Sequence, residues 1–531
     1  MENVENTQAI LSKMQNIKIK IVFKSIVSGI FSGFLVVLYR IALEKVSIFS
    51  HYTYNFLHKN LLFFPLWIIL MIMLGYFVGY IIEKEPMASG SGIPQVEGML
   101  LRKLNMNWIR IIIAKFVGGL ICIGAGLSLG REGPSIQLGA CAAQGVSKNL
   151  KSSKIEEEYL ITGGASAGLS AAFSAPLAGV IFALEEVHKN FSPIVLVSAL
   201  SASIVADFIS KYFFGMKPIF YFFNLSPIPL KNYPYIILLG IILGLLGVLF
   251  NKSLLKCQDL YAKQNYIKKR AYPIIPFILA GFLGLLLPEV LGGGHEIVVS
   301  LMNKPVSLYM LLIILFAKFL FTMISYGSGA PGGIFLPLLS IGALIGAVYG
   351  NIMHSLALFN SQFIPNIIIL SMAGYFSAIV KAPITGIILI TEMSGGFNHL
   401  LSISIVCLTS YIVVEALNSK PIYEVLLERL LSKGTDKIEK ECKAKIIIEA
   451  PVCMSSLLEG KKIKDIKWPS SCLLVAIRRG EKEIIPKGNT VMYAGDYIIV
   501  LADENNSAAI KECLCKYGQT VKGDAEGDGS H

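Results

Sequence analysis

Charged residues are scarce in this sequence of 531 residues. Asp, Glu, Lys and Arg make up 15% of it, whereas hydrophobic residues make up 54%. A water-soluble domain carries roughly 25% charged residues, and the mean hydropathy here is +0.64. The shortage of charge excludes a cytosolic enzyme, a secreted disulfide-stabilised domain and a disordered chain. The sequence therefore predicts a protein that lies largely within a lipid bilayer.

Signals for metals, disulfides and nucleic acids are also missing. The nine cysteines show neither paired CxxC spacing nor a neighbouring histidine cluster. The formal net charge of +12 is not accompanied by a basic segment interleaved with aromatic residues. We therefore expect no zinc site, no cofactor and no nucleic-acid partner. The excess of Lys and Arg fits basic cytoplasmic loops and a surface that attracts anions.

Long segments without any charge are present instead. Leu61 to Ile82, Asn232 to Asn251 and Met393 to Val414 each contain no Lys, Arg, Asp or Glu. At about 20 residues, each is long enough to cross a bilayer as a helix. The first 16 residues are mostly polar and show no cleavable signal, so we expect residues 1–20 to be cytoplasmic.

The segment from Phe319 to Val380 also lacks charge, but glycine and proline interrupt it. The interrupting residues are Gly327, Gly329, Pro331, Gly332, Gly333, Pro337 and Pro365. Irregular backbone is tolerated inside a membrane only where protein buries it or where it lines a polar cavity. We therefore expect broken helices here, at a binding site.

The composition changes after Tyr423, where charged residues become dense and short β-branched runs alternate with turns. These runs are Ile446 to Ile448, Leu473 to Ile477 and Tyr497 to Leu501. The sequence thus predicts an all-α polytopic membrane domain at 21–432, followed by a small cytosolic α/β domain at 443–517. We assign no function to the tail at 518–531.

An internal repeat is visible in the spacing of small residues, prolines and charges. Two sets of positions follow one template, and a transporter whose site lies at the repeat interface is the typical source of such a pattern. The matched pairs are Lys115 with Lys318, Gly130 with Gly333, Pro134 with Pro337, Gly139 with Gly342, Pro176 with Pro383, and Glu185 with Glu392.

Three Gly/Pro segments are candidates for the site: Gly90 to Pro94, Gly130 to Pro134 and Gly333 to Pro337. Proline starts helices readily, and the glycines before it expose successive N–H groups. A helix N-terminus carries the equivalent of roughly half a positive charge and binds anions. Three such ends converging on one point would hold a small anion without a buried cation.

Several polar side chains belong to or adjoin these segments. The Ser91 hydroxyl either caps its own helix or donates to an ion. Glu132 is costly at a membrane helix unless the helix end stabilises its carboxylate. There it would mimic the anion, and on protonation it would move away and carry a proton. We interpret Arg131 as structural, paired with a carboxylate.

Three further residues are open to two interpretations. Glu185 and Glu186 point about 100° apart on a helix, so we expect one to pair and the other to face water. Glu186 is either a cytoplasmic proton entry or a salt-bridge partner at the helix end. Tyr423 opens the last helix, where its phenol either donates to an anion or anchors the helix at the interface.

Five motifs together resemble the CLC family of chloride channels and proton/chloride exchangers. They are GSGIP at 90–94, GREGP at 130–134, APLAGVIFALEE at 175–186, GGIFLP at 332–337 and KPIY at 420–423. The resemblance covers roughly residues 20–432. It implies an inverted repeat with broken helices and a homodimer with one ion pathway in each subunit. It also implies an integral protein of a bacterial plasma membrane, with both termini cytoplasmic.

The resemblance also implies roles for individual residues. Chloride would be coordinated by the Ser91 hydroxyl, the Tyr423 phenol and the backbone N–H groups of Ile334 and Phe335. Glu132 matches the extracellular gating glutamate and Glu186 the internal proton glutamate. The acid at Glu186 favours a proton-coupled chloride antiporter over the alternative, a passive voltage- or ligand-gated chloride channel.

The C-terminal segment resembles the TrkA-C domain of potassium-transport proteins, on LLVAIRRG at 473–480 and on the turn at Ala494 to Asp496. This implies a dimeric regulatory module with a small-molecule ligand, and a purely structural role in the dimer is the alternative. Gly164 to Gly168 fits the GxSxG pattern of a serine hydrolase, centred on Ser166. No upstream strand or histidine context supports that enzyme, so we expect none.

Overall fold

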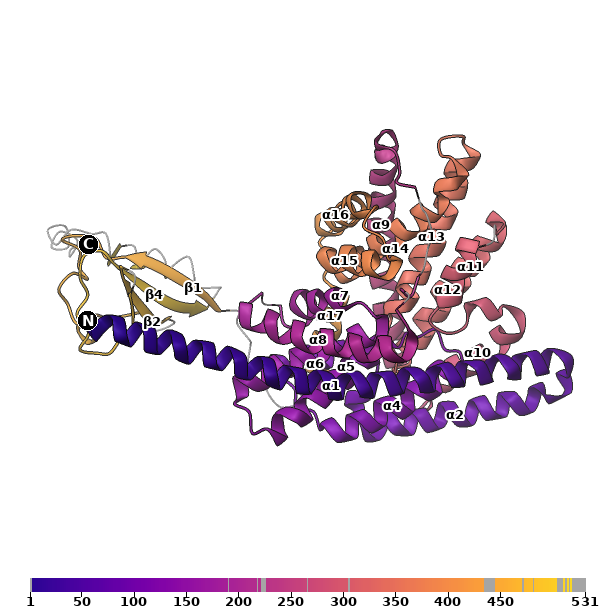
Figure 1. Cartoon of the computed structure of the whole chain (residues 1–531), viewed down its shortest axis with the longest axis horizontal. Coiled ribbons are helices and arrows are strands. Elements are labelled where there is room, and N and C mark those ends of the chain that lie inside the picture. The colour runs from indigo at the N-terminus through magenta and orange to yellow at the C-terminus, as the bar shows by residue number, and fades with distance from the viewer. Residues whose placement is uncertain are drawn as a thin grey trace. The chain divides into compact units, whose positions relative to one another are not determined.

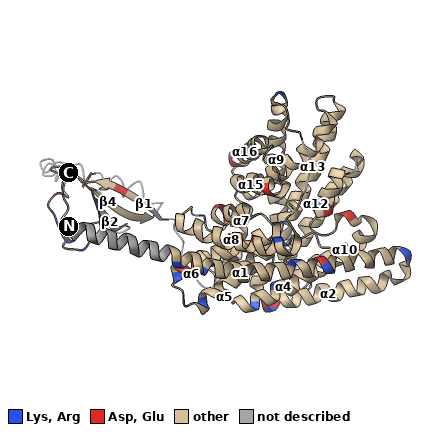
Figure 2. Cartoon of the chain, in the orientation of Figure 1, with Lys and Arg blue, Asp and Glu red and all other residues tan. Residues whose placement is uncertain are grey.

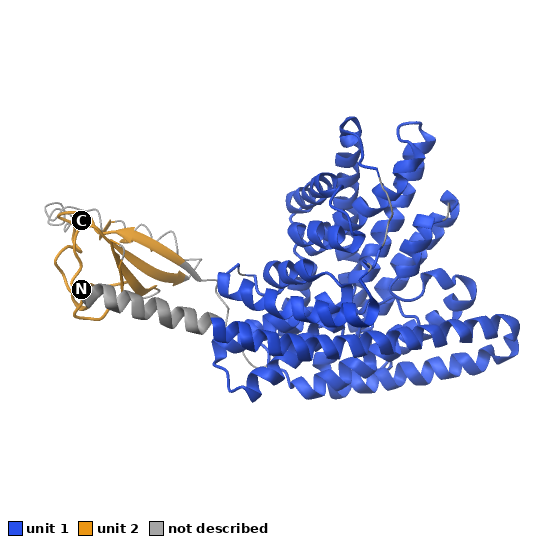
Figure 3. Cartoon of the chain, in the orientation of Figure 1, with its two compact units in different colours: residues 1–433 blue, residues 434–531 orange. Residues whose placement is uncertain are grey.

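The computed structural model describes residues 2–503 except 190, 217, 221–225, 265, 304–305, 434–444, 470–471 and 481, and beyond them residues 510, 513–514 and 516–517. For residues 2–18 only the backbone is described. The predicted tail at 518–531 lies outside the described residues. The chain divides into two compact units, residues 1–433 and 434–531, coloured separately in Figure 3.

The first unit is built from helices (Figure 1). In its first half these are α1 (Glu2–Lys59), α2 (Phe64–Lys84), α3 (Ile93–Leu100), α4 (Trp108–Gly124), α5 (Glu132–Asn149), α6 (Lys154–Phe173), α7 (Pro176–Phe182) and α8 (Pro193–Phe214). In its second half they are α9 (Tyr233–Lys263), α10 (Ile274–Leu286), α11 (His295–Asn303), α12 (Leu308–Gly327), α13 (Phe335–Ser355), α14 (Ile364–Val380), α15 (Pro383–Ser394), α16 (Leu400–Ala416) and α17 (Ile422–Lys433).

The helical unit is an integral membrane domain. Among the described residues, eight helices are long and apolar enough to cross a bilayer. Figure 2 shows how few charges these helices carry. The spans predicted at Leu61 to Ile82 and Asn232 to Asn251 are confirmed by α2 and α9. The span predicted at Met393 to Val414 is wrong, because α15 ends at Ser394 and left-handed Gly395 (φ +72°) caps it, so that α16 begins only at Leu400.

The broken helices predicted between Phe319 and Val380 are present. Helix α12 ends at Gly327, and α13 starts at Phe335 after an irregular segment. This break is buried rather than lipid-exposed, since Ala330, Ile334 and Phe335 show no exposed surface. Protein therefore covers the irregular backbone, as a membrane requires.

The repeat is closest around two buried lysines, Lys115 and Lys318, which are both fully buried. The amine of Lys115 donates to the carbonyls of Ala88 (3.0 Å) and Gly90 (2.6 Å). The amine of Lys318 donates to the carbonyls of Val290 (2.8 Å) and Gly292 (2.5 Å). Each lysine amine thus holds one glycine loop. The two carbonyl oxygens that accept from each amine offset part of the cost of burying it.

The two glycine loops themselves have matching backbones. Gly90 and Gly292 have φ angles of 61° and 62°, and Gly92 and Gly294 have φ angles of 96° and 92°. Such angles strain any residue with a Cβ, which explains the glycines. The loops also bind across the repeat, since Gly90 N–H donates to Gly329 and Gly292 N–H donates to Gly126. The loop at Gly292 to Gly294 is therefore the counterpart, in the second half of the repeat, of the loop that carries Ser91.

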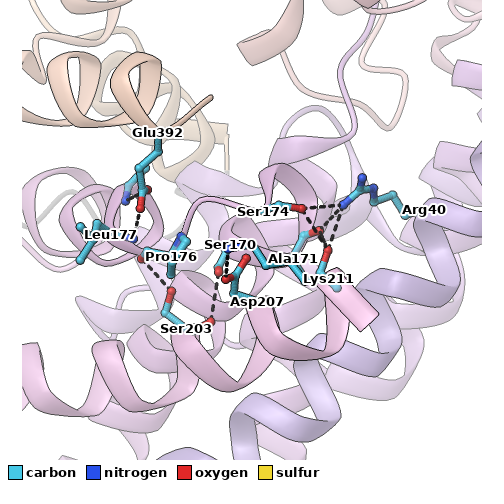
Figure 4. Close-up of polar contacts among 12 residues, drawn as sticks. Arg40, Ser170, Ala171, Ser174, Pro176, Leu177, Ser203, Asp207, Lys211 and Glu392 are labelled. Atoms are coloured by element: carbon cyan, nitrogen blue, oxygen red, sulfur yellow. Dashed lines mark hydrogen bonds and ion pairs between the residues drawn. The ribbon is translucent and has the colours of Figure 1, made fainter. Parts of the chain in front are cut away.

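Two glutamates join the halves by exchanging helix caps. Glu185 accepts from the N–H groups of Ile384 (3.3 Å) and Thr385 (2.7 Å), at the start of α15. Glu392 accepts from the N–H groups of Leu177 (3.2 Å) and Ala178 (2.8 Å), at the start of α7, as Figure 4 shows for Leu177. Each carboxylate also complements the positive end of the helix that it caps. A glutamate from each half thus caps the start of a helix in the other half.

The second unit contains a four-stranded antiparallel sheet of β1 (Lys445–Pro451), β2 (Cys472–Arg479), β3 (Lys482–Ile484) and β4 (Asp496–Asp503). The strand order is β1-β4-β2-β3, with a bulge at Val475. Alternate residues of β1 and β4, including Ile448, Ile498 and Val500, form its core. The three predicted strands are confirmed.

An ion pair between the buried Asp496 and the partly exposed Arg479 closes the turn before β4. Asp496 is 1% exposed and accepts two hydrogen bonds of 2.8 Å from Arg479 and one of 2.9 Å from the N–H of Tyr493. Burial alone would raise the pKa of Asp496, but these donors outweigh it and hold the pKa below its ordinary value. The carboxylate therefore stabilises the folded domain above its unfolded pKa of about 3.9, and this contribution is lost as the pH falls further.

We expect Asp496→Asn to destabilise this domain at pH 7, by about 2 kcal/mol, because Arg479 loses its charged partner. The difference from the wild type should shrink as the pH falls below about 4. Hydrogen–deuterium exchange of the peptide covering β4 measures this difference in stability. Glu483→Gln, on the neighbouring strand β3, is the control, and an equal effect there would rule out the ion pair as the cause.

Candidate anion site

The site begins where the three Gly/Pro segments meet. Gly130 and Gly333 exchange backbone hydrogen bonds of 2.7 and 2.8 Å, which ties the start of α5 to the start of α13. The N–H of Gly332 donates to the carbonyl of Gly90 (2.9 Å), which adds the loop before α3. The structure therefore brings the amino ends of three membrane helices together. Their combined partial charges favour an anion at this point.

Two buried hydroxyl groups of the helical unit lack partners among the described residues. Ser91 is 1% exposed and Tyr423 is fully buried, and neither hydroxyl oxygen makes a hydrogen bond within the described part of the chain. Ser91 is packed against the first turn of α5, since a Cβ on Gly133 would collide with its Oγ. Buried hydroxyls without partners are costly, so both hydroxyl groups are candidates to donate a hydrogen bond to a bound anion.

Backbone donors are free beside them. Ile334 is the N-cap of α13 and Phe335 its first residue, so neither N–H has an acceptor within the helix. Neither donates to another described residue. The ring of Phe335 is held by Phe173, Phe182 and Phe376, at centroid distances of 5.2, 5.9 and 4.7 Å. This aromatic packing fixes the direction of the free N–H groups.

Glu132 lies at the first position of α5 and is fully buried. Neither of its carboxylate oxygens makes a hydrogen bond of good geometry to the described residues, although its own N–H and that of Leu336 interact with it. A Cβ on Gly130 would collide with its Oε2. The carboxyl group therefore occupies the gap between α5 and α13, at the place where helix ends would attract an anion.

Glu186 lies in a π-turn, Ala183–Val187, that follows α7. It is 4% exposed, and its Oε1 has no partner among the described residues. Glu185 instead caps α15. The expectation that one of the two neighbours pairs is therefore confirmed for Glu185, whereas the expectation that the other faces water is wrong, because Glu186 is buried. Tyr423 lies at the start of α17, which packs against α3.

Other candidates are placed elsewhere. Arg131 makes no ion pair within 4.0 Å among the described residues, so its predicted pairing is not observed. Ser166 is buried in the middle of α6, without the strand that a nucleophile elbow needs. Lys115 was recognised in the sequence only as a marker of the repeat. Its spacing of 25 residues from Gly90 was the available signal that it holds the loop of Ser91.

We expect Gly133→Ala to weaken chloride binding about tenfold, because the added methyl group displaces Ser91 or the start of α5. Isothermal titration of the purified protein with chloride measures this. Gly396→Ala is the matched control, since a Cβ there meets nothing within 4 Å. Wild-type affinity in the Gly133 variant would place the ion away from Ser91.

The chain is similar to known membrane transport proteins. A family model described as "Voltage gated chloride channel" matches residues 74–415, and a TrkA-C domain model matches residues 447–514. The chain is 35% identical over 402 residues to the H(+)/Cl(-) exchange transporter ClcA of Yersinia pestis bv. Antiqua (strain Angola), covering 74% of this chain and 82% of that protein.

One further relative and one solved structure are also similar to this chain. The ClcA protein of Salmonella agona (strain SL483) is 35% identical over 372 residues, covering 68% of this chain and 78% of that protein. The crystal structure of a slow cyanobacterial Cl-/H+ antiporter superposes with a TM-score of 0.74 at 31% identity, covering 78% of this chain and 98% of that one.

Proposed function

The chain belongs to the voltage-gated chloride channel (CLC) family, and we propose on that premise that it moves chloride and protons in opposite directions across the membrane. The exchange transporters at 35% identity favour this antiport over a passive channel. We further propose that it works in a bacterial plasma membrane, with both termini in the cytoplasm.

One observation carries the proposal more than any other. Two carboxyl groups of the helical unit, Glu132 and Glu186, are buried, and both have carboxyl oxygens without a hydrogen-bond partner among the described residues. A passive anion pore needs no buried acid, because acids repel its substrate and are costly in a membrane. A protein that also moves protons needs such groups, since a carboxyl group gains and loses a proton in place.

The residues then have the following roles. Chloride binds to the Ser91 and Tyr423 hydroxyls and to the N–H groups of Ile334 and Phe335. The ionised Glu132 carboxylate competes for the same helix ends, and chloride replaces it when it takes up a proton. Glu186 exchanges protons with the cytoplasm. Chloride and proton therefore pass Glu132 in alternation, which couples their fluxes.

All six residues belong to one chain, as a pathway within each subunit requires. We propose that the protein is a homodimer with two such pathways, in line with the family resemblance. The TrkA-C domain would then be a regulatory module that binds a small molecule. Chemical crosslinking of the purified protein in lipid tests for the dimer. A monomer that transports at the full rate would contradict the proposed dimer.

The decisive experiment uses purified protein in liposomes with a chloride gradient and no proton gradient. We expect the chloride gradient to drive protons uphill in the opposite direction. Chloride flux without uphill proton movement would establish a passive channel instead.

A further inference from the structure

Three membrane helices end or begin around one short turn. Helix α2 ends at Lys84, α9 ends at Lys263, and the turn η5 (Lys269–Ala271) leads into α10. The rings of Tyr261 and Tyr272, 5.4 Å apart, pack the end of α9 against the residues that precede α10. Each of the three helices is long and apolar enough to span a bilayer, counted for α10 from Lys269. The turn therefore lies at the boundary between the hydrocarbon core of the bilayer and the headgroups.

Helix α2 and this turn are in contact through their backbones. A Cβ on Gly79 would collide with the carbonyl group of Arg270, and a Cβ on Gly75 would collide with the backbone of Ile274. Glycine has no Cβ and allows this close approach. The backbone contact therefore fixes the position of Arg270 relative to α2.

The guanidinium group of Arg270 lies between two aromatic rings of α2. Its Cζ is 4.4 Å from the centroid of the Tyr76 ring and 4.5 Å from that of the Tyr80 ring. The carboxylate of Glu83 is 3.7 Å from Nε, which is too far for a hydrogen bond. Nε has no hydrogen-bond partner among the described residues, although the side chain is 32% exposed. The rings thus hold a fork of N–H donors in place without using it.

Further lysines add positive charge beside Arg270. Lys84 lies 5.8 Å from the centroid of the same Tyr80 ring. The two lysines that directly precede Arg270 are exposed. None of these three lysines forms an ion pair with a described residue. Positive charge is therefore in excess over the carboxylates of Glu83 and Glu85.

An exposed apolar stripe leads away from the two tyrosines along α2. Leu66, Ile69 and Met73 are 64%, 54% and 64% exposed. Their spacing of three and four residues continues to Tyr76 and Tyr80, and residues at this spacing share one face of a helix. An apolar face of α2 is thus turned outward, with the basic turn at one end of it.

We propose that the turn at Arg270 binds the headgroup of an anionic phospholipid, whose acyl chains lie along this stripe of α2. The guanidinium fork of Arg270 donates to two oxygens of the phosphate group. Lys84 and the two lysines before Arg270 add attraction to the anionic headgroup. The site is separate from the residues of the chloride pathway, so the inference does not rest on the proposed function.

Native mass spectrometry of the purified protein in detergent tests the site. Dioleoylphosphatidylglycerol is compared with dioleoylphosphatidylcholine, which has the same acyl chains and no net charge. We expect the anionic lipid to bind preferentially, and Arg270→Gln to weaken its binding about fivefold. Lys231→Gln is the control, because this exposed lysine lies before the start of α9, at the other end of that helix. Equal binding of the two lipids, or an unchanged preference in Arg270→Gln, would overturn the proposal.

Thermal unfolding in the two lipids separates lipid binding from packing. The anionic lipid should raise the unfolding temperature of the wild type more than the neutral lipid does, and Arg270→Gln should lose this difference. If Arg270→Gln unfolds earlier in both lipids and keeps the difference, the side chain only packs against α2 and the proposed site is wrong. Inorganic phosphate in large excess should not displace the lipid, because it has no acyl chain. Displacement by phosphate would contradict a lipid site.

A second copy of the chain is the other candidate occupant of this face. Met73→Cys, in the middle of the stripe, should not crosslink two subunits in lipid with a short bismaleimide reagent beyond the background of the wild type. Strong crosslinking would identify the stripe as a subunit interface and overturn the lipid site. Chloride-driven proton transport by the same preparations tests the proposed function separately.

Discussion

Replacing Glu132 with Ala is expected to abolish chloride-driven proton transport and to leave chloride flux in place. The carboxyl group is buried at the junction of α5 and α13, and no other described acid lies at that junction. Without this carboxyl group, the junction has no group that can carry a proton between the two faces of the membrane. The helix ends that attract chloride remain. Proton flux in liposomes should fall by about two orders of magnitude or more.

Glu296→Ala is the matched control for this variant. Its carboxylate lines a cavity that Gly130 and Arg131 also line, but it is 69% exposed and lies outside the junction. We expect it to transport protons at the wild-type ratio to chloride. Uphill proton movement that survives in Glu132→Ala would remove Glu132 from the pathway.

The second large effect is expected for Glu186→Gln. Glutamine keeps the shape of the side chain but holds no exchangeable acid proton, so proton movement should stop or fall at least about tenfold. Chloride binding should be spared, because Ser91, Ile334 and Phe335 keep their positions. Proton flux and chloride titration on the same preparation measure the two effects separately.

Its neighbour provides a sharp control. Glu185→Gln alters a carboxylate one residue away, which caps α15 rather than facing the interior. We expect that variant to retain proton coupling and to lose about 1 kcal/mol of stability, measured by thermal unfolding in detergent. Equal loss of coupling in both variants would mean that Glu186 acts through the packing of α7 and not through its proton.

The sequence predicted the helix breaks around the candidate site, because these breaks depend on glycine and proline spacing. Breaks before Glu132 and Phe335 follow from residues that cannot continue a helix, and they recur at matching positions in both halves. The stop after Met393 was missed, because a hydropathy count treats Gly395 as an ordinary apolar position, whereas its positive φ ends the helix.

Other features depend on contacts between distant segments and were beyond sequence reasoning. The apolar run before Glu186 is typical of a regular helix, and only the backbone of the structure shows the π-turn in which Glu186 lies buried. Arg40 lies in a long helix with nothing to mark it as part of a cavity wall. Its burial results from serines on α6 and α8 that are 134 and 170 residues away.

The exchange of caps between Glu185 and Glu392 has a consequence for biosynthesis. Ala178 waits for an acceptor that lies 214 residues further along the chain, which at ordinary rates of translation takes roughly 10–40 s. During that interval the amino-terminal half is already in the bilayer with an uncapped helix start. The start of α7, in the first half of the chain, is therefore capped only after residue 392 has been made. A ribosome that stalls before residue 392 leaves a membrane intermediate that is open to quality-control proteases.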